Sequence, residues 1–223
     1  MYLFFIPAII GAYLLGSIPF GLLIAWVHGM DLRSIGSGNI GATNVARALG
    51  RKWAYICFAL DVLKGLVPML AVLPLTTSLS AQSQTEKTIV LFLWLAVGCA
   101  AILGHIFPVY LKFKGGKGVS TSFGVALGLW PYYTICALIA IAVWAVVVFI
   151  WRYVSLASVT ASVAFPLALI VSIALRPGWE IAHLWPLVIA ATAIPLMVII
   201  RHRENIKRLL SGTESKIHQK KNA

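Results

Sequence analysis

The sequence predicts an all-α integral membrane protein with seven transmembrane helices, its N-terminus outside and its C-terminus in the cytoplasm. Of its 223 residues, 61% are hydrophobic and only 11% are charged, and the mean hydropathy is +0.94. A soluble domain is roughly 25% charged, so this composition is typical of a polytopic membrane protein. Each span needs about 20 apolar residues, which leaves room for roughly six to eight spans and for no additional soluble domain.

The apolar runs define the spans in order. The first run, 3–27, is interrupted at 16–21 by Gly-Ser-Ile-Pro-Phe-Gly, where proline and glycine predict a kink. The fourth, 119–130, is too short for an upright full span, and its Gly124-Val-Ala-Leu-Gly128 motif predicts close helix packing. The remaining spans are expected at 53–75, 88–108, 132–151, 159–175 and 181–200. The chain therefore divides into a transmembrane domain, 1–201, and a basic cytoplasmic tail, 202–223, in which 204–210 has the spacing of a surface helix.

The distribution of positive charge gives the orientation. Fifteen of the 18 Lys and Arg residues lie in segments 28–52, 109–118, 152–158 and 201–223, whereas the loops on the opposite side hold only Lys87 and Arg176. Loops rich in Lys and Arg stay in the cytoplasm. This rule predicts an outside N-terminus and an odd number of spans.

The net charge of +12 narrows the possible partners. Such an excess can indicate nucleic acid, anionic lipid or anionic substrates. With this hydropathy we expect membrane lipids and anionic substrates, and no nucleic acid. Cys57, Cys99 and Cys136 each lie inside an apolar run without the spacing of a disulfide framework or a zinc site.

Two polar segments on the predicted cytoplasmic side are candidate anion sites. The first, 36–47, reads Gly-Ser-Gly-Asn-Ile-Gly-Ala-Thr-Asn-Val-Ala-Arg and combines glycines, hydroxyl and amide donors and one guanidinium. The second, 112–121, reads Lys-Phe-Lys-Gly-Gly-Lys-Gly-Val-Ser-Thr and ends where a helix should begin. It does not match the Walker A pattern. Each segment also has a plain interpretation, as a solvated connector or as a basic loop that fixes the topology.

Other polar residues have two interpretations each. Asp61 and Lys64 lie three residues apart inside a span, as an internal pair or as part of a substrate path. His105, at the end of the third span, could be a general base or a hydrogen-bonding residue. Ser155 and Ser158 could serve a substrate or simply cap the next helix.

The tail begins with Arg-His-Arg-Glu-Asn-Ile-Lys-Arg at 201–208, a run that usually stops transfer. However, His202 and Asn205 are helix neighbours, as are Asn205 and Arg208. A second interpretation is therefore that these side chains face one cytoplasmic basin.

Six ordered motifs together resemble the bacterial acyl-phosphate:glycerol-3-phosphate acyltransferase family. They are Gly-Ser-Ile-Pro-Phe-Gly at 16–21, Gly-Ser-Gly-Asn-x-Gly-Ala-Thr-Asn at 36–44, Asp-x-x-Lys-Gly at 61–65, Gly-His-x-Phe-Pro at 104–108, Phe-Lys-Gly-Gly-Lys-Gly-Val at 113–119 and Arg-His-x-x-Asn-Ile at 201–206. The resemblance covers nearly the whole chain.

The resemblance implies transfer of a fatty acyl group from acyl phosphate to the sn-1 hydroxyl of glycerol 3-phosphate, giving lysophosphatidic acid and phosphate in the first acylation of phospholipid synthesis. It places the protein in the bacterial inner membrane with its active site on the cytoplasmic face. Acyl phosphate is already activated, so no cofactor, nucleotide, metal or covalent intermediate is expected. The enzymes that make acyl phosphate and that carry out the second acylation are the implied protein partners. The His-x-x-x-x-Asp pattern of acyl-CoA-type acyltransferases follows none of the five histidines.

The resemblance also implies the site residues. Ser37, Arg47 and Lys117 are the expected catalytic residues, which hold phosphate and neutralise developing charge. The expected substrate-binding residues are Gly38, Asn39, Thr43, Asn44, His105, Lys112, Lys114, Gly115, Gly116, Gly118, Thr121, Ser155, Ser158, His202, Asn205 and Arg208. Of these, Ser155, His202 and Asn205 would orient glycerol 3-phosphate, and which loop holds which phosphate stays open.

Two other classes of protein explain part of the sequence. A transporter of phosphate compounds would also need a basic cytoplasmic vestibule, but its polar motifs should cross the membrane rather than gather on one side. A lipid-binding scaffold explains the basic face but not the Gly, Ser, Asn and Thr residues of segment 36–47.

Overall fold

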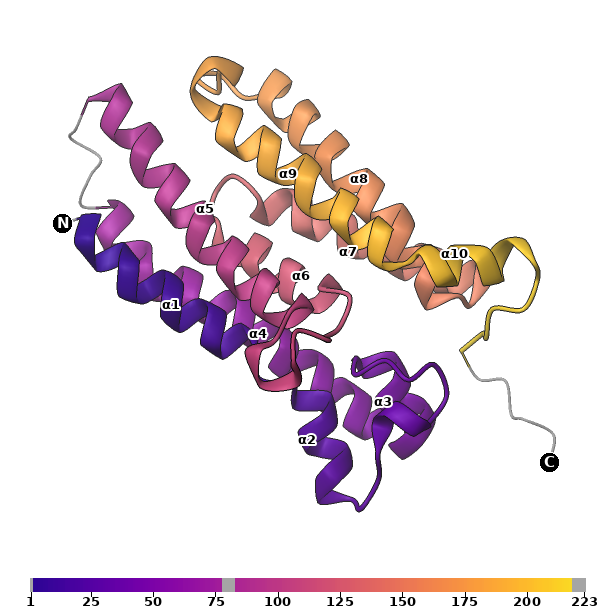
Figure 1. Ribbon diagram of the computed structural model, residues 1–223. Coiled ribbons are helices and arrows are strands. Elements are labelled where there is room, and N and C mark those ends of the chain that lie inside the picture. The colour runs from indigo at the N-terminus through magenta and orange to yellow at the C-terminus, as the bar shows by residue number, and fades with distance from the viewer. Residues whose placement is uncertain (1, 78–82, 218–223) are drawn as a thin grey trace. The chain divides into compact units, whose positions relative to one another are not determined.

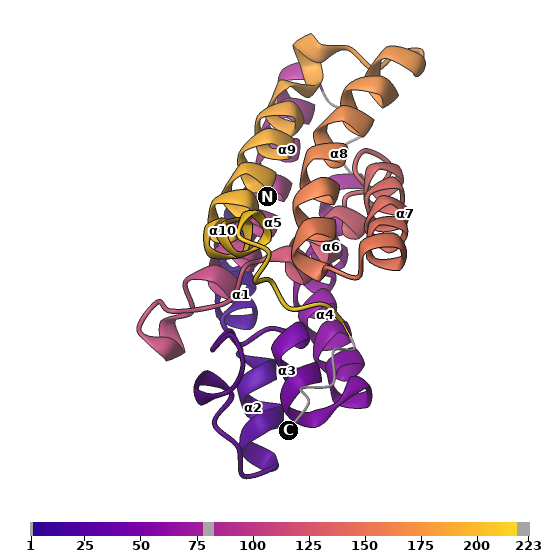
Figure 2. The ribbon, with the colours of Figure 1, turned by 90° about the vertical axis from the view of Figure 1, so that its right-hand side faces the viewer.

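The computed structural model describes residues 2–77 and 83–217, which are helical over most of their length (Figures 1 and 2). The predicted loop 76–87 and the predicted tail 202–223 therefore lie partly outside the described residues. The chain divides into two compact units, Met1–Trp130 and Pro131–Ala223. Each unit has its own helix packing and its own polar cluster.

The first unit is built on long helices that pack along one another. In it α1 packs against both α4 and α5, and α4 packs against α6 (Figure 1). Its helices are α1 (Phe5–Gly16), α2 (Phe20–Val27), α3 (Ala42–Leu49), α4 (Arg51–Thr77), α5 (Gln84–Ile106) and α6 (Val119–Gly128), with 3₁₀ turns at η1 (Tyr2–Phe4), η2 (Leu32–Ser34) and η3 (Val109–Leu111).

The predicted interruption of the first span is confirmed. Helix α1 ends at Gly16 and α2 begins at Phe20, with Pro19 at its N-cap. Proline has no N–H to donate, which favours a break in the helix at this point. The carbonyl oxygen of Ile18, freed by the interruption, accepts a hydrogen bond of 3.0 Å from Lys64 Nζ on α4. A charged side chain within a span thus satisfies a backbone group that lipid could not.

In the second unit, successive helices run antiparallel to one another and pack as hairpins. The unit consists of α7 (Thr134–Trp151), α8 (Val154–Leu175), α9 (Ile181–Arg201) and the short tail helix α10 (Arg203–Leu210). Helix α8 packs against both α7 and α9, and α10 contacts the ends of α8 and α9 (Figure 2). The helix expected at 204–210 is therefore present.

Among the described residues, six segments are long and apolar enough to cross a membrane, and α1 with α2 counts as one of them. The predicted fourth span corresponds to α6, which has only 10 residues. At about 1.5 Å per residue it covers roughly 15 Å, half of a hydrocarbon core. Large apolar side chains such as Phe149 and Leu175 stay 86% and 76% exposed, as lipid-facing residues do.

The start of α8 corrects one expectation. The sequence suggested a polar joint at 152–158 with a span from 159, but the helix begins at Val154 with Tyr153 at its N-cap. Ser155 and Ser158 therefore lie inside the helix, and the capping interpretation is wrong. Ser158 Oγ donates to the carbonyl of Val154, 2.9 Å away and one turn back, which lets a hydroxyl sit within a helix at little cost.

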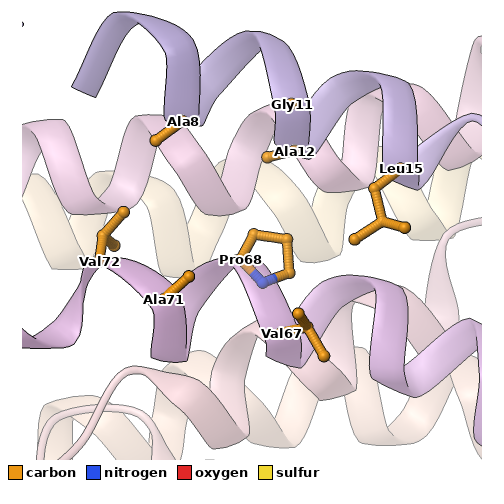
Figure 3. Close-up of a pocket in the computed structure, with 8 residues that line it drawn as sticks. All are labelled: Ala8, Gly11, Ala12, Leu15, Val67, Pro68, Ala71 and Val72. Carbon is orange, nitrogen blue, oxygen red and sulfur yellow. The ribbon is translucent and has the colours of Figure 1, made fainter. Parts of the chain in front are cut away.

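Glycines allow the backbones in the first unit to touch. A Cβ at Gly124 would overlap the carbonyl oxygen of Val62, and one at Gly128 would come within 2.5 Å of Met69 Cβ. The predicted close packing at this pair of glycines is confirmed. The contact between α1 and α4 is more open, because small residues leave an apolar groove of about 240 Å³ between these two helices (Figure 3). The groove is lined by Ala8, Gly11, Ala12, Leu15, Val67, Pro68, Ala71 and Val72.

Two glycine-to-alanine variants test this packing. Gly124→Ala should destabilise the protein by about 1–3 kcal/mol, because the backbones of α4 and α6 must separate. Gly11→Ala is the matched control: a Cβ there finds no described atom within 4 Å, and alanine favours a helix by up to about 1 kcal/mol. Thermal unfolding in detergent measures both. Equal melting temperatures for the two variants would contradict the contact between α4 and α6.

Candidate functional site

The first candidate loop is folded around Asn44. This side chain is 1% exposed, and its Nδ2 donates to the carbonyls of Leu32 and Ile35 at 3.0 and 2.9 Å. Its Oδ1 accepts from the backbone N–H of Ser37 at 3.1 Å. Asn44 thus fixes the path of the loop that precedes α3.

The residues around Asn44 leave polar groups at the surface. Asn39 Oδ1 accepts from the N–H of Gly41 at 3.0 Å, a turn that a short amide side chain favours. Ser37, Thr43 and Arg47 are exposed, and the last two lie one turn apart on α3. A Cβ at Gly36 would lie 3.1 Å from Arg47 Cδ, so the arginine stem runs along the loop backbone.

The second candidate loop lies against the end of α5. Its backbone N–H groups at Gly115 and Gly116 donate to the carbonyls of Ile106 and His105 at 3.1 and 3.0 Å. Gly118 has φ +88°, a left-handed conformation that glycine adopts without strain, and α6 starts immediately after it. The loop exposes Lys112 and Lys114, half-exposes Lys117, and buries Gly116, Gly118 and Thr121.

One hydrophobic cluster supports both loops. The cluster contains Leu32 and Ile40 from the first loop region, Val45 from α3 and Cys57 from α4. Leu111, which leads into the second loop, packs against the same cluster. In the first unit, the two glycine-rich loops therefore pack against the same hydrophobic cluster.

Asp61 and Lys64 form the expected internal pair, with 2.7 Å between Asp61 Oδ1 and Lys64 Nζ. Both side chains are buried inside the unit. His105, in the last turn of α5, places Nδ1 3.6 Å from the same carboxylate oxygen and 3.1 Å from Thr121 Oγ1. His105 is therefore held inside the unit rather than presented on its surface.

In the second unit, Glu214 gathers three of the predicted site residues. Its carboxylate accepts hydrogen bonds of 2.7 Å each from Ser155 Oγ, Asn205 Nδ2 and Arg208 Nε. The expectation that Asn205 and Arg208 face one place is confirmed. Burial alone would raise the pKa of Glu214, but the bonds from Asn205, Ser155 and Arg208 outweigh it and lower the pKa below its usual value.

Sequence reasoning missed Glu214, which it left within a tail described only as basic. The available signal was that Glu214 is one of only six acidic residues in the sequence and lies six positions after Arg208, close enough to pair with it. The same segment is tied down by the N–H of Ile217, which donates to the carbonyl of Arg152 at 2.8 Å.

Two other predicted residues of this unit, His202 and Ser158, are buried in contacts within and between helices. His202 is 3% exposed, and its Nδ1 lies 2.8 Å from the carbonyl of Val198, one turn earlier on α9. Ser158 Oγ accepts from Trp144 Nε1 at 3.3 Å, which joins α7 to α8. Thus the structure groups Ser155, Asn205 and Arg208 around one carboxylate and gives Ser158 a packing contact.

The sequence profile of a family described as glycerol-3-phosphate acyltransferase matches residues 6–212. The glycerol-3-phosphate acyltransferase of Geotalea daltonii is 44% identical over 211 residues, which is 94% of this chain and 96% of that protein.

Two solved structures also resemble the chain. Both are crystal structures of PlsY, an integral membrane glycerol 3-phosphate acyltransferase. The glycerol 3-phosphate form has a TM-score of 0.80 at 42% identity and covers 96% of this chain and 95% of its own. The lysophosphatidic acid form has a TM-score of 0.77 at 41% identity, with the same coverage.

The contacts of Glu214 should depend on pH. Because its pKa is lowered in the folded protein, its stabilising contribution is fully present above the ordinary glutamate pKa of about 4.3 and is lost as pH falls through the lowered value. Hydrogen exchange at 211–217, corrected for intrinsic rates, should therefore accelerate below about pH 4. Glu214→Gln should show faster exchange already at pH 7 and little further change. Slow, pH-independent exchange in the unaltered protein would contradict this assignment.

Proposed function

Because this chain belongs to the glycerol-3-phosphate acyltransferase family, we propose that it transfers a fatty acyl group from acyl phosphate to the sn-1 hydroxyl of glycerol 3-phosphate. The products are lysophosphatidic acid and inorganic phosphate. Support comes from a family profile over residues 6–212 and from solved relatives described in glycerol 3-phosphate and lysophosphatidic acid forms. The family and the membrane-length helices make the protein an integral membrane acyltransferase.

The main support for the proposal is that both glycine-rich loops of the first unit pack against the same hydrophobic cluster. Arg47 lies on α3, directly after the first loop, and Lys117 lies in the second, so each loop pairs a cation with glycine backbone. Two substrates that each carry a phosphate need two such cationic positions. A guanidinium binds phosphate as a planar fork and an ammonium binds it as a point charge.

The proposed reaction is a direct displacement. The sn-1 oxygen attacks the carbonyl carbon of acyl phosphate, and the bond from that carbon to the phosphate oxygen breaks as phosphate leaves. Ser37, Arg47 and Lys117 stabilise the charge that develops on the carbonyl and phosphate oxygens. Ser155, His202 and Asn205 orient the acceptor, and the remaining loop residues complete the two phosphate positions.

The hydroxyl proton goes to a substrate phosphate in this scheme. His105, the histidine nearest the loops, holds its Nδ1 close to Thr121 and Asp61 rather than toward solvent. Loss of turnover in His105→Ala with folding and substrate binding intact would argue instead for a protein base.

The proposed topology has seven membrane segments, with α6 as a short fourth segment, an outside N-terminus and a cytoplasmic tail from 202. It follows from the positive-inside rule and puts both loops on the cytoplasmic face of the bacterial inner membrane. Acyl phosphate, glycerol 3-phosphate and membrane lipids are then the partners, with the enzymes that supply acyl phosphate and consume lysophosphatidic acid as neighbours in the reaction sequence.

Purified protein tests the activity. With glycerol 3-phosphate present, we expect release of phosphate and formation of lysophosphatidic acid from acyl phosphate but not from acyl-CoA. Turnover of acyl-CoA at the same rate, or no acyl transfer from either donor, would overturn the proposal.

Removal of either cation tests the two-phosphate arrangement. Arg47→Ala and Lys117→Ala should each raise the KM of a phosphate substrate by about 10–100-fold, the effect expected for loss of a charge-assisted hydrogen bond. Lys87→Ala is the matched control, because Lys87 is an exposed cation at the start of α5 and belongs to neither loop. Unchanged kinetics in both loop variants would remove these residues from the site.

A further inference from the structure

We propose that Asp61 is a positioning residue for the phosphate-binding loop 112–118, on which it acts through His105. The inference rests on the proposed function and assigns a role to a buried charge that the reaction scheme leaves unused.

Asp61 is buried at a position where an unpaired charge would be costly. It is 2% exposed within a membrane-length helix, where ionisable side chains are costly unless paired. Lys64 pairs with Oδ1 at 2.7 Å, and Cys57 Sγ lies 3.8 Å from Oδ2. The pair alone could be a structural tie, since Lys64 also reaches the carbonyl of Ile18. Further contacts extend the network toward the loop.

Thr121 and His105 provide that extension. Thr121 Oγ1 donates to the carbonyl oxygen of Asp61 at 3.0 Å, and this hydroxyl oxygen of Thr121 also lies 3.1 Å from His105 Nδ1. A hydroxyl has one proton to donate, so in the contact with Thr121 it is Nδ1–H that donates. The Asp61 carboxylate, 3.6 Å from Nδ1, favours the same protonation. The ring of His105 is thereby fixed in orientation and tautomer.

The loop lies directly on this ring. The carbonyl of His105 accepts from the N–H of Gly116, and the carbonyl of Ile106 accepts from that of Gly115. A Cβ at Gly116 would overlap His105 Nε2, so the backbone of the loop touches the imidazole itself. Any rotation of the ring must therefore displace Gly116, and Lys117 is the next residue.

The arrangement places a rigid chain of contacts between a carboxylate in the membrane and a lysine in the site. Asp61 holds His105, His105 supports Gly116, and Gly116 sets the position of Lys117. Such supporting contacts matter because a small displacement of a charged group from its substrate weakens binding. Thr121 is fully buried and fits a supporting role.

A double-mutant cycle tests the proposal in the acyltransferase assay. Asp61→Asn should raise the KM of the same substrate as Lys117→Ala by about tenfold, with a smaller change in kcat. The double variant should be no worse than Lys117→Ala alone, because both changes act on one group.

The matched control is Trp94→Phe, which removes a buried hydrogen bond of 3.1 Å from α5 to Met69 on α4, the two helices that hold His105 and Asp61. Trp94 lies about 16 Å along α5 from His105, and its effects should multiply with those of Lys117→Ala.

A second pair of variants covers the case in which Asp61→Asn fails to fold. Thr121→Val removes the hydroxyl but keeps the ion pair, and Thr121→Ser restores the hydroxyl. Because Thr121 is itself one of the expected substrate-binding residues, these variants are compared by hydrogen exchange at 112–118, which we expect to be faster with valine than with serine.

Independent effects of Asp61→Asn and Lys117→Ala, or equal behaviour of the valine and serine variants, would overturn the proposal. The unaltered protein in the same assay reports separately on the proposed function, since its failure to transfer acyl groups would leave no KM to compare.

Discussion

The close approach of helix backbones at glycine is the constraint on which the first unit depends. A Cβ at Gly16 would overlap the carbonyl of Ala101, and one at Gly65 would overlap the carbonyl of Thr121. Helices in a bilayer gain little from the hydrophobic effect when they associate, so packing between small residues must hold them. Because α4 and α6 touch at this distance, Asp61 can reach Thr121, and the polar network of this unit becomes possible.

The two units hold their polar groups in place in different ways. In the first, main-chain groups shape the loops, and Asn44 alone holds three backbone groups in place. In the second, Glu214 draws together side chains from α8 and α10 that could otherwise move independently.

Sequence reasoning found most of the long helices because apolar length and charge are local properties. The interruption at Pro19, the pair of Asp61 with Lys64 and the glycine contact of Gly124 were all predictable from short segments. It missed α3, which lies inside a segment assigned wholly to a polar loop, because glycine and asparagine dominate the first half of that segment. It also missed Glu214, whose contact with Ser155 joins residues 59 positions apart. Separations of that size leave no periodic signal in one sequence.

The spacing of Asp61 and Lys64 also bears on how the protein enters the bilayer. A lone aspartate or lysine at the centre of a helix opposes insertion by about 2.5–3.5 kcal/mol. Three residues apart on α4, the two can neutralise each other as soon as that helix forms. His105 and Thr121 come later in the chain, so the pair must shelter itself before α5 and α6 arrive. The same two residues therefore lower the cost of inserting α4 and, in the folded protein, also bind His105 and the carbonyl oxygen of Ile18.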